Sequence, residues 1–525
     1  MAASVDARAL KGWLSDGAEI ALLDVREQGQ YSAGHPFFAV PAAYSVLELR
    51  LPALVPNPAV RVALLDDGDG VAQRAAKSAV ALGYANVHVL EGGAPAWAAA
   101  GYTLFDGVNV PSKTFGEIIE IERHTPRITA DQLEAMRRAG ENMVIVDGRT
   151  FAEFQRMNIP GGISCPNGEL ALHIGALAPD PTTKIVVNCA GRTRSIIGAQ
   201  TLIDFGVPNP VVALENGTQG WFLAGLDLER GARRHYGTTA KPADIAQRQA
   251  RARALAGRHG VVFVTATEAR RWAADGTRTT YLLDVRSPEE FATGAVPGFV
   301  HAPGGQLIQA TDQWVGVRGA RLVLLDSEMV RAPVVAAWLR QLGHEACVLD
   351  GGATAAATSQ WPAARTAAVP PALQAVAAKD AAEAIRAGGL QVIDLRPSMT
   401  YRKGHIAQAR WSIRPRVTQA ASAGKPVLLV AEDASVAALA ALDLAQAGFN
   451  DVRLLQGDAA AWQAAGLDVD ATPGTPPDAD CIDFIFHTHL RHDGSREAAQ
   501  AYLTWEVALP DRLDAQERGA FRIVV

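Results

Sequence analysis

The residues with the clearest chemical potential form one short segment, Cys189-Ala190-Gly191-Arg192-Thr193-Arg194-Ser195. The β-branched run 185–187 comes before it and predicts a buried strand. Apolar residues at helical spacing follow it as far as Gly206, which predicts a helix closed by a C-cap glycine. A thiol between the two would lie among inward-pointing backbone N–H groups at the positive end of a helix.

This setting predicts that Cys189 is a nucleophile. The helix end and the neighbouring Arg192 and Arg194 are expected to lower the pKa of the thiol from about 8.5 to roughly 3.5–7.5. The same N–H groups would hold an oxyanion. A cysteine that ends a buried strand is commonly a small core residue, but the pair Arg192 and Arg194 would be costly to bury without an anion. The loop therefore predicts a thiolate that faces an anionic substrate.

Composition limits the class of protein. The 525 residues suggest three to five domains, and 49% hydrophobic with 20% charged residues indicates a globular chain. A net charge of −6 argues against a nucleic-acid partner. No apolar run approaches the roughly 18 residues of a membrane span. Four cysteines in so long a chain are no disulfide framework, and no signal peptide is evident, so we expect a cytoplasmic protein.

One pattern occurs four times along the chain. A strand that ends in Asp-x-Arg is followed by an aromatic residue, a Gly- or Pro-containing turn, a second apolar strand, a helix that ends in glycine and another short strand. The Asp-x-Arg pairs are Asp24 with Arg26, Asp147 with Arg149, Asp284 with Arg286 and Asp394 with Arg396. Short apolar strands that alternate with helices predict an α/β fold, with a central, mostly parallel sheet flanked by helices in each repeat. Ligands are then expected at the carboxyl ends of the strands, where Cys189 falls.

The linkers between the repeats suggest the domain boundaries. We expect four domains at 1–110, 126–235, 258–366 and 372–470, followed by a C-terminal extension at 471–525. Residues 107–125 are expected to be a linker. The charged stretch 230–259 is expected to be a solvated connecting helix.

The four loops can be aligned on the glycines that end the helices, Gly83, Gly206, Gly343 and Gly448. Counting back seventeen residues from each gives Asp66, Cys189, Asp326 and Ala431. Neither aspartate is a soft sulfur nucleophile, and the acidic loops around them would repel an anion. We therefore expect only the second domain to be catalytic.

Together, these motifs resemble the rhodanese family. The resemblance rests on the repeated Asp-x-Arg, the Gly-His-Ile and Ile-Pro-Gly turns, the strand–Cys loop–helix segment and the Gly-Gly-x-x-x-Trp ending, and it covers the chain to about residue 470. It implies an α/β fold and sulfur transfer through a cysteine persulfide. In this family a six-residue loop is typical of sulfurtransferases, and Cys189 to Arg194 is six residues long if the helix starts at Ser195.

The resemblance implies a mechanism with two half-reactions. Cys189 would attack the sulfane sulfur of a small anionic donor such as thiosulfate, while the loop residues Ala190, Gly191, Arg192, Thr193, Arg194 and Ser195 bind the anion. The persulfide would then pass its outer sulfur to a cyanide or thiol acceptor, including a protein thiol. No metal or organic cofactor is expected.

Other polar residues have simpler interpretations. Asp147 and Arg149 are expected to be a structural ion pair near the site, because all four repeats keep the pair. Cys165 could resolve the persulfide, but its surroundings favour a short strand. His487, His489 and His492 could suggest a metal site. We favour instead a C-terminal extension that packs back on another domain, because Phe484, Phe486, Tyr502, Leu503 and Trp505 need burial.

Two alternatives stay open. Cys189 could serve a phosphatase or arsenate reductase, whose loops in related proteins are typically seven residues long. The chain could also be a persulfide carrier or scaffold, in which three inactive domains recruit a partner and Cys189 only relays sulfur.

Overall fold

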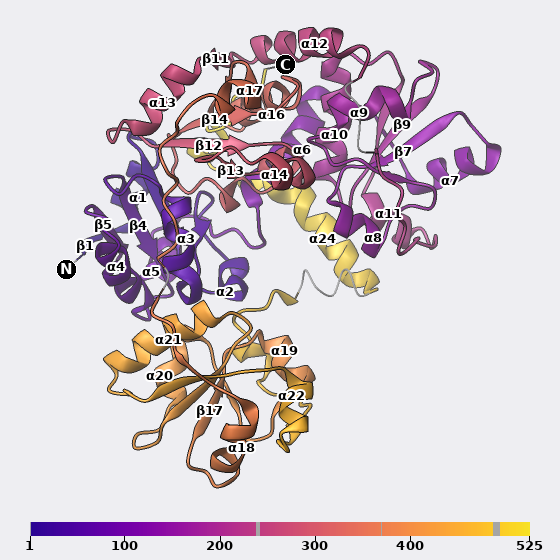
Figure 1. Cartoon of the computed structure of the whole chain (residues 1–525). Helices are drawn as coiled ribbons and strands as arrows, with labels where there is room; N and C mark the ends of the chain where they lie inside the picture. The colour runs from indigo at the N-terminus through magenta and orange to yellow at the C-terminus, as the bar shows by residue number, and fades with distance from the viewer. Residues whose placement is uncertain (1, 238–241, 369, 487–493, 525) are drawn as a thin grey trace.

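The structure is a computed structural model that describes residues 2–237, 242–368, 370–486 and 494–524. It contains four α/β units in chain order. The first three pack together, and the fourth, in orange in Figure 1, packs against the first.

Each unit is built on a five-stranded sheet in which all neighbouring strands run parallel. The order is the same in all four units: first, fifth, fourth, second and third strand of the sheet. The strands are β1 (Ala3–Val5), β2 (Ile20–Asp24), β3 (Val40–Pro41), β4 (Arg61–Leu65) and β5 (Val87–Leu90); β6 (Arg127–Ile128), β7 (Met143–Asp147), β8 (Ile163–Ser164), β9 (Lys184–Asn188) and β10 (Val211–Leu214); β11 (Val262–Val264), β12 (Thr280–Asp284), β13 (Val300–His301), β14 (Arg321–Leu325) and β15 (Glu345–Leu349); and β16 (Gln374–Val376), β17 (Gln391–Asp394), β19 (Arg410–Trp411), β20 (Val427–Val430) and β21 (Val452–Leu455). The fourth unit adds a small antiparallel pair, β18 (His405–Ile406) and β22 (Val469–Asp470). The predicted fold class is confirmed.

Helices cover these sheets and connect the units. They are α1 (Ala7–Trp13), α2 (Gln28–Ala33), α3 (Leu47–Leu54), α4 (Val71–Ala81), α5 (Gly93–Ala99) and α6 (Val110–Arg123); α7 (Ala130–Ala139), α8 (Phe151–Arg156), α9 (Leu170–Leu177), α10 (Thr193–Phe205), α11 (Gly217–Leu223) and α12 (Ile245–Arg258); α13 (Ala266–Ala274), α14 (Pro288–Gly294), α15 (Gly304–Gln309), α16 (Arg331–Gln341) and α17 (Gly352–Ala357); α18 (Ala378–Arg386), α19 (Ser398–Lys403), α20 (Val417–Ala420), α21 (Ala434–Gln446) and α22 (Ala459–Ala464); and α24 (Arg496–Ala508) and α25 (Ala515–Arg518). Short 3-10 turns lie at Tyr44–Val46 (η1), Thr311–Gln313 (η2), Arg414–Arg416 (η3), Asp478–Asp480 (η4) and Leu509–Arg512 (η5). Among the described helices, none is long and apolar enough to cross a membrane.

The segment expected to be a linker between the first two units is the buried helix α6. Phe115 and Ile119 are fully buried, and the ring of Phe115 meets the ring of Trp338 edge to face. Apolar residues three and four positions apart give α6 one apolar face, and that face joins a core shared by the first three units. The segment does separate the two units, but its helix and its burial were not predicted, because its apolar positions lie among charged ones.

The second connection, α12, is also more buried than its charge suggests. Ala252, Leu255 and Ala256 lie in the core, where α12 packs on α10 and α16. Arg248 is buried as well, while Arg253 and Arg258 are exposed, so the expectation of a solvated helix was wrong for one face. As a result, the second and third units share a continuous apolar core.

The C-terminal extension returns to the first two units, as expected. In Figure 1 the yellow helix α24 runs beside α6 and α11. Tyr502 and Leu503 are buried against them, and the ring of Trp505 lies over the backbone of Gly107, where a Cβ would clash at 2.4 Å. Glycine is therefore required at position 107 for this close approach.

The fourth unit docks on the first through buried charge. Arg414 donates to Glu48 at 2.6 Å and to Asp443 at 3.2 Å, and the guanidinium lies over the ring of Tyr44. Because Arg414 is almost fully buried, these contacts hold the two units in one arrangement.

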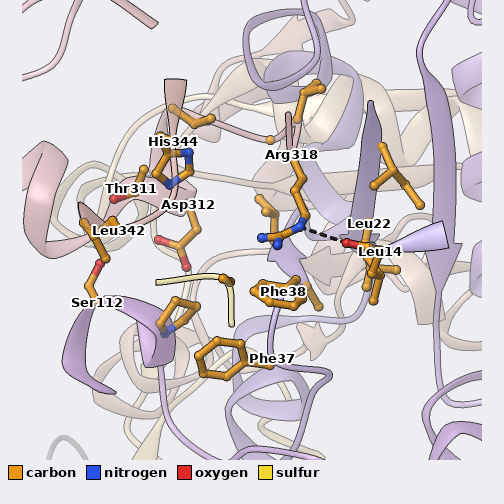
Figure 2. Close-up of a pocket in the computed structure, with 18 of the residues that line it drawn as sticks. Leu14, Leu22, Phe37, Phe38, Ser112, Thr311, Asp312, Arg318, Leu342 and His344 are labelled. Carbon is orange, nitrogen blue, oxygen red and sulfur yellow. Dashed lines mark hydrogen bonds between the residues drawn. The ribbon is translucent and has the colours of Figure 1, made fainter. Parts of the chain in front are cut away.

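A small apolar cavity of about 90 Å³ marks the junction of the first unit, the third unit and α6. Figure 2 shows Phe37, Phe38, Asp312 and Arg318 around it. The guanidinium of Arg318 lies 3.9 Å over the ring of Phe38, and its Nε donates to the carbonyl of Leu14 at 3.0 Å. Burial raises the pKa of Asp312 to about 6, although Arg50 opposes the shift. One oxygen of this carboxylate, Oδ1, has no hydrogen-bond partner among the described residues.

Candidate active site

Cys189 follows strand β9 directly and precedes helix α10. Its side chain is buried, and its Sγ lies 3.6 Å from the Oγ of Ser195 in the first turn of the helix. The start of α11 closes the loop from one side, because Thr218 and Gln219 donate their amide N–H groups to the carbonyls of Cys189 and Ala190. A Cβ at Gly217 would lie only 2.2 Å from the carbonyl oxygen of Cys189, so this packing requires glycine there.

Helix α10 begins at Thr193, two residues before the start at Ser195 on which the loop length was counted. Thr193 and Arg194 therefore belong to the first turn, and Ser195 and Ile196 donate to the carbonyl of Arg192. Within the described part of the chain, the amide N–H groups of residues 190–194 donate to no protein acceptor. They form a nest of donors at a helix N-terminus, which suits an anion or an anionic sulfur.

The equivalent loops of the first and third units already contain an anion. The carboxylate of Asp66 accepts the amides of Gly68, Gly70 and Ala72 at 2.9, 3.1 and 2.9 Å. That of Asp326 does the same with Met329, Val330 and Arg331 at 3.0, 2.9 and 2.8 Å. An aspartate at the position of the cysteine thus fills the nest from within. In the fourth unit Ala431 has no side chain that could do so.

Arg192 was expected to face the substrate, but the structure directs it away. Its Nε and Nη2 donate to the two carboxylate oxygens of Glu117 at 2.8 Å each, and Nη2 also contacts Glu120. Both glutamates belong to α6, which comes close to α10 because Gly116 faces Thr193. The arginine side chain is 6% exposed and acts as an anchor between α6 and the loop.

Arg194 lies in the cleft but is also paired. Its two Nη atoms donate to the carboxylate of Glu153 on α8 at 2.8 and 2.7 Å. Burial opposes ionisation of Glu153, yet the fields of Arg194 and Arg149 lower its pKa to about 2. Arg194 is the loop arginine whose charge acts on Cys189.

The expected fall in the thiol pKa is a second point that the structure corrects. Burial raises the pKa of Cys189 above its ordinary value, and Arg194 and the hydrogen bond to Ser195 offset this only in part. Glu506 adds to the rise. The sequence argument counted the positive groups of the loop but could not include the loss of water or a carboxylate from a distant helix.

The cleft over Cys189 has a volume of about 220 Å³ and is assembled from the loop and four other parts of the chain. Besides the loop, its lining comprises Val108, Asn109 and Lys113 before and on α6, Glu153 on α8, Gln306, Gln309, Ala310 and Gln313 of the third unit, and Tyr502 and Glu506 on α24. None of these lining residues was predicted from the sequence, because no local pattern signals a contact between segments that are distant along the chain.

The Asp-x-Arg pairs have one geometry in all four units. Arg149 donates to Asp147 at 2.7 Å and to the carbonyl of Met157 at 2.6 Å, and both charged side chains are buried. The other three pairs are Asp24 with Arg26, Asp284 with Arg286 and Asp394 with Arg396, each at 2.6 Å. In each unit the arginine ties the end of a strand to the carbonyl eight residues later, so it fixes the turn beside the nucleophile loop.

The remaining cysteines lie away from the cleft. Cys165 is fully buried after β8, and burial raises its pKa well above its usual range. Cys347 and Cys481 are also free and buried. The residues His487, His489 and His492 lie outside the described residues. Among the described residues, no group of three or more His, Cys, Asp or Glu side chains is arranged to hold a metal ion.

Comparison with known proteins gives a consistent family assignment. The family model described as the rhodanese-like domain matches four segments of the chain, 6–100, 129–224, 265–358 and 377–465. The crystal structure of a thiosulfate sulfurtransferase from Pseudomonas aeruginosa is 40% identical to this chain. It superposes with a TM-score of 0.90, and the alignment covers 100% of both chains.

A curated relative shares only one region. An HTH-type transcriptional regulator of Mycobacterium tuberculosis is 35% identical over 105 residues, which are 20% of this chain and 45% of that protein. The chain therefore spans less than half the length of this relative.

Proposed function

Because the chain belongs to the rhodanese family, we propose that it is a sulfurtransferase of the thiosulfate sulfurtransferase type, with one active site at Cys189. The observation that carries this proposal is a nest of N–H groups that donate to no described protein acceptor around a buried cysteine, at the position where two other units hold an aspartate. The 40% identity to a thiosulfate sulfurtransferase over the full length supports thiosulfate, or a donor like it, as the substrate.

In the first half-reaction, the Cys189 thiolate attacks the outer sulfur of thiosulfate. A bond forms between Sγ and that sulfur, the sulfur–sulfur bond of thiosulfate breaks, and its electron pair leaves with sulfite. The amides of residues 190–194 stabilise the charge on the donor and then the persulfide. Arg194 supplies the positive charge that acts on Cys189, while Arg192 anchors the loop to Glu117 on α6.

In the second half-reaction, a nucleophilic acceptor takes the outer sulfur and leaves Cys189 as the thiolate. Cyanide serves as the acceptor in an assay, and a thiol is the proposed acceptor in the cell. This chemistry moves sulfur without a net change of redox state, so it needs no bound cofactor. Since all four cysteines are free, we propose a reducing compartment such as the cytoplasm.

We assign catalysis to the unit at 126–235 and propose that the units at 1–110, 258–366 and 372–470 are non-catalytic. Asp66 and Asp326 supply no sulfur nucleophile and occupy the donors that a persulfide would need. The third unit still contributes to the reaction, because Gln306 and Gln309 line the cleft.

The test combines turnover with intact mass. Wild type should form thiocyanate from thiosulfate and cyanide, and thiosulfate alone should add the mass of one sulfur atom. Cys189→Ser should do neither, while Cys165→Ser, which changes a buried cysteine outside the cleft, should retain both activities. A sulfur adduct without turnover would favour a carrier. The absence of any adduct on wild type would refute sulfur transfer.

A further inference from the structure

A buried carboxylate on α24 faces the nucleophile loop. Glu506 is 1% exposed, and its Oε1 accepts a hydrogen bond from the Oγ1 of Thr193 at 2.8 Å. The Nζ of Lys113 lies 3.7 Å from the same oxygen and donates to the hydroxyl of Tyr502. These contacts fix the position of the carboxylate at the wall of the cleft.

The other oxygen of this carboxylate, Oε2, has no hydrogen-bond partner among the residues that the structure describes. Oε2 points toward Gly191, because a Cβ added to that glycine would lie 3.0 Å from it. The oxygen therefore lies directly above the loop that starts at Cys189. A buried carboxylate oxygen without a partner is costly, and a ligand that donates a hydrogen bond removes that cost.

The charges around the cleft favour such a donor. Arg192 is neutralised by Glu117 and Glu120, and Arg194 is neutralised by Glu153. Lys113 is the remaining cation of the cleft lining, and Glu506 lies next to it. With no excess of positive charge, the cleft suits an acceptor that arrives neutral and protonated better than one that arrives as a second anion.

We propose that Glu506 is a catalytic residue of the second half-reaction, in which its Oε2 accepts the proton of a small thiol. The proposal rests on the sulfurtransferase function above. The thiol R–SH gives its proton to Glu506, and its sulfur attacks the outer sulfur of the Cys189 persulfide. The bond between the two persulfide sulfurs breaks, and its electron pair stays on Sγ. The product leaves as the persulfide of the acceptor, and the proton passes from Glu506 to water.

The experiment compares two acceptors on one preloaded enzyme. The full-length protein is loaded with thiosulfate, and loss of the outer sulfur is followed by intact mass with either cysteine or sulfite as acceptor. Sulfite is used at a pH where it is the dianion, so this acceptor carries no proton to remove. The variant is Glu506→Gln, which retains an oxygen for Thr193 and the shape of the side chain. The control is Glu497→Gln, which removes the same charge from an exposed position on α24.

General base catalysis is worth about 10²–10⁴-fold, so Glu506→Gln should slow transfer to cysteine by about 100-fold or more. Transfer to sulfite should be unchanged or faster, because a negative charge near the cleft is removed. Glu497→Gln should match wild type with both acceptors. An equal loss with both acceptors, which a merely structural role would cause, or an unchanged rate with cysteine would overturn the role of Glu506 and leave the sulfurtransferase function intact. Wild type that takes up no sulfur would overturn both.

Discussion

Replacing Asp66 with alanine should destabilise the loop of the first unit that corresponds to the Cys189 loop of the second. The carboxylate is buried and accepts three backbone N–H groups within 3.1 Å. A hydrogen bond to a charged group contributes roughly 1.5–3 kcal/mol, and the cost of burying the carboxylate offsets several kcal/mol of the sum. We therefore expect Asp66→Ala to reduce the free energy of local opening by about 3 kcal/mol.

Amide hydrogen exchange measures this free energy residue by residue. About 3 kcal/mol corresponds to roughly 150-fold faster exchange at Gly68, Gly70 and Ala72. Asp69→Ala is the control, because Asp69 is exposed in the same loop and accepts one backbone amide, that of Val71 at 3.2 Å, where Asp66 accepts three. If both variants exchange alike, the carboxylate of Asp66 does not hold the loop.

The complementary change is Cys189→Asp in the second unit. Aspartate should accept the amides of this loop as Asp66 and Asp326 do in the first and third units, and so stabilise the loop by about 1–3 kcal/mol while abolishing sulfur uptake. Cys189→Ser should lose activity without that gain. A less protected loop in the aspartate variant would refute the view that the nest is built for an anion.

Three further outcomes are expected. Because burial raises the pKa of Cys189, the rate of sulfur uptake from thiosulfate should keep rising with pH above the ordinary thiol range, and Arg194→Gln should move the stopped-flow profile to still higher pH. The pKa of Asp312 is about 6 in the fold and about 3.9 when unfolded, so the stability that it contributes is present below about pH 4 and is lost as pH rises through 6. In thermal unfolding, Asp312→Asn should therefore raise the free energy of unfolding by at most about 3 kcal/mol at about pH 8 and leave it unchanged below about pH 4. Arg414→Met should weaken the packing of the fourth unit on the first by about 3–5 kcal/mol, because it leaves Glu48 buried without its partner. The fourth unit should then separate from the first and increase the radius of gyration in small-angle scattering. An unchanged radius of gyration would contradict this role.

The sequence supported predictions wherever the relevant contacts are local. Apolar strands, Asp-x-Arg pairs and glycines at helix ends recur within each repeat, so the α/β fold followed from them. The ion pair of Asp147 with Arg149 spans two positions and has the same geometry in every unit. Such features depend on neighbours along the chain, which the residue order states directly.

The electrostatics of the site could not be predicted in the same way. The partner of Arg192 is Glu117, 75 residues earlier, and the partner of Thr193 is Glu506, 313 residues later. Whether an arginine faces a substrate or a carboxylate depends on which helix packs beside it, and α6 was taken for a linker. The prediction that the pKa of Cys189 is lowered was wrong for the same reason, because its burial and the charge of Glu506 come from distant segments.

Because α24 lies far beyond Cys189 in the chain, the nucleophile loop is synthesised well before the helix that completes the cleft. At roughly 5–20 residues per second, the ribosome adds the 313 residues between Thr193 and Glu506 in about 16–60 s. Throughout that interval the second unit has its nucleophile loop but lacks one wall of the cleft. A nascent chain therefore carries Cys189 in a cleft that still lacks Tyr502 and Glu506, and a chain cut short before α24 never completes that cleft.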